Sequence, residues 1–145
     1  MILTCPSCGK KNRSPAHRLT EIGRCGACKT PISPVAKPID ADPEIFDDVM
    51  AHAELPILVD FWAAWCGPCR RAAPEVQRTA AEMAGRAVVL KVDTERHPEI
   101  AARFRVESIP NFVVIKGGRV VMQQPGLVAS SQMVKWLESA EIGVS

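Results

Sequence analysis

The chain has 145 residues, 47% of them hydrophobic and 23% charged, which excludes intrinsic disorder for most of its length. No apolar run is long enough to cross a membrane, and the first residues lack the features of a secretory signal, so we expect a cytoplasmic protein with no membrane partner. The net charge of +2 is uneven: residues 1–37 carry +6 and the remainder carries −4, which indicates two units with different roles.

The six cysteines form three Cys-x-x-Cys pairs, and no cysteine stands alone. A secreted disulfide scaffold would need an export signal and would rarely place every cysteine at this spacing. Metal binding or redox chemistry in a reducing compartment is therefore the better interpretation.

The first unit, residues 1–34, contains few large apolar side chains and cannot form a stabilising core unaided. Its two cysteine pairs are sixteen residues apart, and small or turn-forming residues lie between the cysteines of each pair. Four thiolates at this spacing are typical of a closed, structural zinc site, so we expect one Zn²⁺ per chain, which would supply the missing stability. The four expected ligands are Cys5, Cys8, Cys25 and Cys28.

Two other interpretations of this unit remain open, namely two redox-active disulfides or a zinc site with a short-lived oxidised form. His17 lies between the pairs and could replace a cysteine, although four cysteines already complete a site. The basic segment 10–13 could contact nucleic acid, but one cluster without aromatic residues is more typical of a solvated face. We therefore expect no nucleic-acid partner.

From residue 35 onwards the sequence alternates between strand and helix patterns. Residues 35–39 predict a short strand, which Pro38 restricts to a sheet edge. Asp42 followed by Pro43 predicts a helix start. The near-continuous apolar run at 57–62 predicts a central strand covered on both faces.

A long helix is expected at 66–84, with Pro74 inside it as a source of a kink. A strand is predicted at 87–92 and a helix at 98–104. The strands 112–116 and 119–123, joined by Gly117 and Gly118, are predicted to form a hairpin. The last predicted helix begins at Ser130 or Ser131 and buries Met133, Val134 and Leu137. The order β-α-β-α-β-α-β-β-α predicts an α/β fold with a mixed sheet and helices on both faces.

The third cysteine pair lies where the central strand meets the long helix. Cys66 would lie at the helix N-terminus, where free backbone N–H groups and the helix dipole favour a thiolate. Cys69 follows three residues later on the same helical face and can close a disulfide with Cys66. We expect Cys66 to be the exposed attacking thiolate and Cys69 the deeper resolving thiol, while Gly67 and Pro68 keep the turn between them compact.

Asp60 is an acid inside the apolar central strand, where a carboxylate is costly unless it has a role. Burial should raise its pKa towards neutrality, so that it could accept the proton that Cys69 must lose. Lys91, in the neighbouring predicted strand, is a candidate partner for this carboxylate. A cis peptide at Ile109-Pro110 would press the backbone against the sulfurs.

The segment from Asp60 to Cys69, together with Pro74, Ile109-Pro110 and Gly117-Gly118, resembles thioredoxin over about residues 36–141. The resemblance implies a thioredoxin fold in which Asp60 is the buried acid and Pro110 the cis-proline. The client-docking surface that it implies comprises Trp65, Gly67, Pro68, Ile109, Pro110 and Gly126.

Two departures from the family pattern lie near this docking surface. Asn111 replaces a common threonine, and Arg70 and Arg71 stand where one basic residue is usual. We interpret both departures as bearing on client preference rather than on the chemistry.

The Gly-Pro between the cysteines is similar to that of thioredoxins, which reduce disulfides. A four-cysteine zinc motif before a thioredoxin domain resembles the bacterial thioredoxin-2 type, so that the resemblance covers nearly the whole chain. It implies a protein-disulfide reductase in cell redox homeostasis that serves disulfide-containing clients and is regenerated by an NADPH-dependent flavoprotein, thioredoxin reductase. We therefore expect a zinc-binding domain at 1–34 and a thioredoxin domain at 35–145, in a monomer without a bound organic cofactor.

An alternative function is a zinc-dependent, chaperone-like module that binds clients on a thioredoxin platform. Binding of clients that lack disulfides, and its loss on removal of residues 1–34, would favour this alternative. A third hypothesis couples the two units, since oxidation of the four N-terminal thiolates could release zinc and alter access to Cys66.

Overall fold

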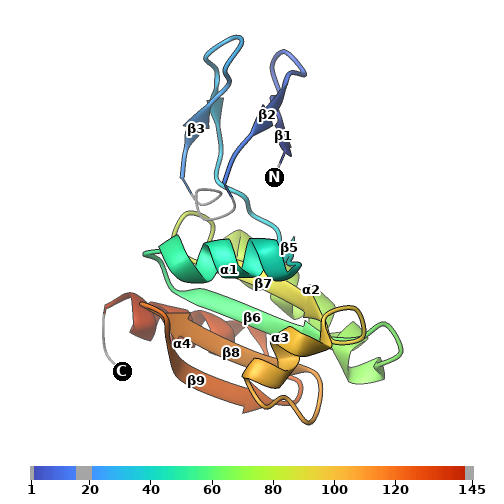
Figure 1. Ribbon diagram of the computed structural model, residues 1–145. Coiled ribbons are helices and arrows are strands. Elements are labelled where there is room, and N and C mark those ends of the chain that lie inside the picture. Colours follow the sequence, from blue (N-terminus) through green and yellow to red (C-terminus); the bar gives the residue numbers. More distant parts are fainter. Residues whose placement is uncertain (1, 16–20, 143–145) are drawn as a thin grey trace.

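The computed structural model describes residues 2–15 and 21–142 of the chain (Figure 1). His17, the candidate substitute ligand, lies outside the described residues. The described residues form two small N-terminal hairpins followed by a five-stranded sheet that has helices on both faces.

The two hairpins each carry one of the N-terminal cysteine pairs in their turn. Strand β1 (Ile2–Thr4) pairs with β2 (Lys11–Arg13), and β3 (Gly23–Arg24) pairs with β4 (Pro31–Ile32), both antiparallel. These strands were not predicted, because segments of two or three residues are too short to show an alternating pattern.

The main sheet has the strand order β5-β7-β6-β8-β9. Its strands are β5 (Ile39–Asp40), β6 (Ile57–Trp62), β7 (Val88–Asp93), β8 (Asn111–Lys116) and β9 (Arg119–Pro125). Strands β5 and β6 run parallel to β7, whereas β8 runs antiparallel to β6 and β9, so the predicted mixed sheet is confirmed. Strand β6, which leads into the cysteine pair, lies at its centre.

Four helices cover the sheet, namely α1 (Pro43–His52), α2 (Gly67–Glu82), α3 (Pro98–Arg103) and α4 (Ser130–Glu141). One buried core lies between the sheet and helices α1 and α3, and a second lies between the sheet and helices α2 and α4. Side chains alternate along β6: Val59 faces the first core and Leu58 the second. This alternation places Asp60 on the α2 face, towards the cysteine pair.

Most predicted boundaries from residue 57 onwards agree with the structure within two residues. The predicted strand at 35–39 is wrong, since only Ile39 and Asp40 pair with β7. Pro38 has no N–H to donate to a strand ladder, so regular pairing begins after it, and β5 is an edge strand as predicted. Pro74 lies inside α2, and Val134 is only half-buried rather than buried.

The hairpins contact the rest of the molecule through Leu3 of β1. This side chain packs both against the small cluster formed by Cys5, Cys25 and Ile32 and against the core beneath α1. The hairpins accordingly stand on the α1 side of the sheet (Figure 1). None of the helices in the described part of the chain has the length and apolar character needed to span a membrane.

Candidate functional site

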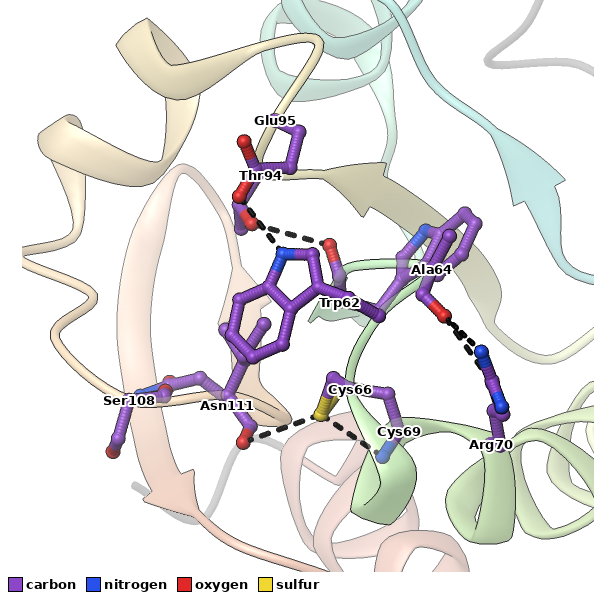
Figure 2. Close-up of a disulfide and its surroundings, with 11 residues drawn as sticks. Trp62, Ala64, Cys66, Cys69, Arg70, Thr94, Glu95, Ser108 and Asn111 are labelled. Carbon is purple, nitrogen blue, oxygen red and sulfur yellow. Dashed lines mark hydrogen bonds between the residues drawn. A yellow bond between two sulfur atoms is a disulfide. The ribbon is translucent and has the colours of Figure 1, made fainter.

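The third cysteine pair lies in the first turn of α2, directly after the loop that leaves the central strand β6 (Figure 2). Cys66 is the N-cap residue, and its Sγ accepts a hydrogen bond from the backbone N–H of Cys69 at 3.2 Å. The two residues form a disulfide with a Cα–Cα distance of 5.2 Å, within the usual range for this bond. The predicted redox pair is therefore present, in its oxidised state.

The expectation of an exposed Cys66 above a deeper Cys69 is wrong for this oxidised state. Cys66 is 3% exposed and Cys69 is 6% exposed, because the backbone around Ile109 covers the first sulfur, with its carbonyl oxygen 3.7 Å from Sγ. The two cysteines differ instead in helix position. Cys66 faces the free N–H groups of the first turn, where a thiolate is stabilised most.

The predicted docking residues from distant parts of the chain meet beside the disulfide. The Ile109-Pro110 peptide is cis, as expected, and the backbone N–H of Gly126 donates to the carbonyl of Pro110 at 2.8 Å. Gly126 has a φ of +93°, a conformation that favours glycine. Gly67 and Pro68 are exposed on the helix end of the same surface.

Trp65 is 67% exposed and is held in place by Glu95, which accepts a hydrogen bond from its indole Nε1 at 2.9 Å. A groove of about 540 Å³ lies between Trp65, helix α3 and Ile109, immediately next to the disulfide. This role of Glu95 was not predicted, because a residue thirty positions away carries no local signal of the contact.

Asp60 is 2% exposed, and its Oδ1 has no hydrogen-bond partner among the described residues. Burial raises the pKa of this carboxyl from 3.8 to about 7, while the positive charge of Lys91 opposes the shift. Lys91 is the direct neighbour of Asp60 in β7, and its Nζ lies 4.5 Å from the ring centroid of Trp62. The structure thus brings together the predicted acid and its predicted partner.

A cavity of about 260 Å³ connects Asp60 with the second cysteine, since both residues line it together with Lys91. The cavity is large enough for water and has polar groups on its wall. Its geometry therefore permits a proton to pass from Cys69 to the Asp60 carboxylate.

Arg70 holds the loop that precedes the disulfide. Its Nε and Nη2 both donate to the carbonyl oxygen of Ala64, at 3.2 and 2.9 Å, and Figure 2 shows the side chain reaching back to that loop. Arg71 makes no comparable bond to any described residue. The two arginines were predicted to act alike, because only the folded loop distinguishes them.

The four N-terminal cysteines converge as predicted. All four Sγ atoms lie within 4.8 Å of one another, with Cys5 and Cys25 buried and Cys8 and Cys28 exposed. Two sulfur contacts join the two hairpins, since the Sγ atoms of Cys5 and Cys28 lie 3.6 Å apart, as do those of Cys8 and Cys25. A closed set of four soft sulfur donors fits a tetrahedral zinc ion without an open position.

Two further side chains hydrogen-bond to this sulfur cluster. Asn12 donates to the Sγ of Cys25 at 3.5 Å, and the hydroxyl of Thr30 lies 3.1 Å from the Sγ of Cys28. Hydrogen bonds from the backbone of Cys28 and then from Asn12 lower the pKa of Cys25 to about 6. This role of Asn12 was not predicted, since in the sequence the residue stands out only as part of the basic segment 10–13.

Comparison with known proteins agrees with this geometry. The thioredoxin family model matches residues 35–139, and a second model, described as "Thioredoxin 2, N-terminal", matches residues 4–30. Thioredoxin C-3 of Corynebacterium nephridii is 36% identical over 138 residues, which cover 95% of this chain and 94% of that protein. Thioredoxin 1 of Chlorobaculum tepidum is 41% identical over 90 residues, or 62% of this chain and 89% of that protein.

Among solved structures, the chain is similar to the crystal structure of chloroplastic thioredoxin z. The two match with a TM-score of 0.68 and 29% sequence identity, over 75% of this chain and 98% of that chain. The residues that the thioredoxin family model matches, 35–139, include the main sheet and the disulfide.

Proposed function

Because the chain belongs to the thioredoxin family, in which it acts as a protein-disulfide reductase, we propose specific roles for the residues around its disulfide. The observation that carries the proposal is a cysteine pair in the first turn of α2 with a buried carboxyl behind it. Cys66 and Cys69 transfer two electrons to a client disulfide and are oxidised to their own disulfide.

In the first step, the thiolate of Cys66 attacks one sulfur of the client disulfide. The client S–S bond breaks, a mixed disulfide forms between Cys66 and the client, and the other client sulfur leaves as a thiolate. The N-cap position and the N–H of Cys69 stabilise the attacking thiolate.

In the second step, Asp60 accepts the proton of the Cys69 thiol through the cavity that both residues line. The Cys69 thiolate attacks Cys66, the mixed disulfide breaks, and the client sulfur leaves as a thiolate. A carboxyl pKa of about 7 suits this transfer, because the group is partly ionised near neutral pH. Lys91 favours the ionised form of Asp60.

The client docks on the surface around the disulfide, with its chain beside the cis-proline loop and in the groove next to Trp65. Exposed aromatic and flat backbone surfaces suit many client sequences, since they recognise shape rather than charge. The proposed docking residues are Trp65, Gly67, Pro68, Ile109, Pro110 and Gly126.

The four-cysteine centre holds one zinc ion through Cys5, Cys8, Cys25 and Cys28, and the ion would join the two hairpins. We place the metal-binding domain at residues 1–34 and the thioredoxin domain at 35–145. An NADPH-dependent thioredoxin reductase regenerates the Cys66–Cys69 dithiol and so completes the electron-transport cycle. The protein acts in the cytoplasm as a monomer.

Serine substitutions test the two cysteine roles in an insulin-reduction assay. Cys66→Ser removes the attacking sulfur and should abolish turnover, whereas Cys69→Ser should form a mixed disulfide with the client that persists on a non-reducing gel. Each variant is the control for the other, because both replace one cysteine of the same disulfide by serine and differ only in which sulfur remains. Turnover that survives in Cys66→Ser, or trapping by Cys66→Ser instead of Cys69→Ser, would contradict the assignment.

A further inference from the structure

We infer that Asn12 is a positioning residue of the metal centre, which joins the two cysteine turns and sets their affinity for zinc. This inference rests on the proposed zinc site. It concerns a side chain outside the ligand set that hydrogen-bonds to groups in both hairpins.

The two cysteine turns repeat the same backbone hydrogen bonds. The N–H of Cys5 donates to the carbonyl of Lys10, and the N–H of Cys25 donates to that of Thr30, both at 2.9 Å. In each turn the residue four positions after the first cysteine has a positive φ, 76° at Gly9 and 64° at Lys29. The turns are therefore equivalent position by position.

Asn12 breaks this equivalence. It stands seven residues after Cys5, and the corresponding residue after Cys25 is Ile32, which is 9% exposed and packs against the sulfur cluster. Where the second hairpin presents an apolar side chain to the cluster, the first presents an amide. This amide faces Cys25, which is fully buried and cannot receive a hydrogen bond from bulk water.

All the polar atoms of the Asn12 amide are used. Its Nδ2 donates to the carbonyl of Lys10 at 3.1 Å and to the Sγ of Cys25 at 3.5 Å, and its Oδ1 accepts from the backbone N–H of Gly26 at 2.8 Å. The reverse orientation would place the oxygen against Lys10 and the sulfur, and the NH₂ against an N–H group. The amide orientation is therefore determined by its partners.

These bonds matter because the hairpins share no strand pairing, and no backbone hydrogen bond joins them in their described residues. Among the described residues, Asn12 links the two turns in addition to the sulfurs and the small apolar cluster. Its N–H stabilises negative charge on a buried ligand, and its oxygen fixes the turn that carries that ligand. Groups of this kind around a metal centre typically change metal affinity by about 10- to 100-fold.

Zinc affinity of the full chain, measured by competition with a chromophoric chelator, tests the inference. Asn12→Ala should bind zinc about 10- to 100-fold more weakly than the unaltered chain. Asn12→Asp keeps the acceptor for Gly26 but places a carboxylate against the sulfur, so it should bind still more weakly. Cobalt(II) loading should show four-thiolate charge-transfer bands in both variants, because neither removes a ligand.

Ser7→Ala is the matched control, since Ser7 is exposed between two ligands and makes no hydrogen bond to a described residue. It should bind zinc within about twofold of the unaltered chain. If either Asn12→Ala or Asn12→Asp binds zinc as tightly as the unaltered chain does, the inference about Asn12 is wrong while the proposed zinc site stands. Absence of zinc binding by the unaltered chain overturns both the zinc site and the inference.

Discussion

At the scale of single residues, the chemistry of Asp60 depends on its burial. The same carboxyl on the surface would be ionised at neutral pH, but in β6 its pKa rises to about 7 because the surrounding core solvates charge poorly. The folded state therefore binds a proton that the unfolded chain has released between about pH 4 and pH 7. The stability of the protein should fall as the pH rises through this range.

Asp60→Asn should raise the free energy of unfolding at pH 8 by up to about 4 kcal/mol, because it removes a buried ionised group, and should have little effect near pH 4. The measurement is denaturant unfolding of the oxidised protein at both pH values. Asp40→Asn, a substitution of the same kind at an exposed site of β5, is the control. An equal effect of Asp60→Asn at both pH values would contradict a raised pKa for Asp60.

At the scale of elements, the junction between β6 and α2 places the disulfide. The chain leaves the C-terminal end of the buried central strand β6 and passes through a short loop, after which Cys66 caps helix α2. The middle of this loop, Ala64 and Trp65, is exposed and has little packing to hold it, whereas Ala63 is buried. The two hydrogen bonds from Arg70 to the Ala64 carbonyl therefore contribute to holding it.

Arg70→Ala should lower the free energy of unfolding of the oxidised protein by about 1 kcal/mol, the usual net contribution of such a hydrogen bond. It should also slow insulin reduction, because the loop that carries Trp65 loses its anchor. Arg71→Ala removes the same charge from the next position and should change stability by less than about 0.5 kcal/mol. Equal effects of the two substitutions on stability and rate would show that charge, rather than the contact with Ala64, is responsible.

At the scale of the whole molecule, the two units differ in what stabilises them. The sheet has an extensive core on each face, whereas among the described residues of the hairpins only Cys5, Cys25 and Ile32 form a buried cluster. So small a cluster cannot offset the conformational entropy of ordering about 30 residues. The hairpins should therefore depend on the metal, and the sheet should not.

Native mass spectrometry of the freshly purified protein should show one zinc ion per chain, which a strong chelator removes. After removal, backbone amides of the hairpins should lose their protection from hydrogen exchange, while those of β6 and β8 should keep it. Restoring zinc to the chelated sample is the control and should restore protection. A metal-free mass that is lower by the hydrogens of two or three disulfides would identify the N-terminal cysteines as redox groups instead.

Local signals in the sequence were sufficient for most of the main sheet. The apolar run of β6, the Asp42-Pro43 helix start and the Gly117-Gly118 turn each determine their element through neighbouring residues, and the structure confirms all three. The short strands of the hairpins and the position of β5 could not be predicted well. The hairpin strands are too short to show an alternating pattern of their own. Strand β5 is positioned by its pairing with β7, about fifty residues away in the chain.

Three features can be read from the amino-acid order alone, because they depend on residue type and local position, namely the cysteine spacing, the acid inside the central strand and the proline before β8. The folded structure was needed to show how Arg70 differs from Arg71, which carboxylate holds Trp65, and that Asn12 reaches Cys25. It also showed that both active cysteines are covered. The contacts of Trp65 and Asn12 join residues that are separated in the chain, and the contact of Arg70 depends on the folded loop before α2. Their geometry exists only after the sheet and hairpins have formed.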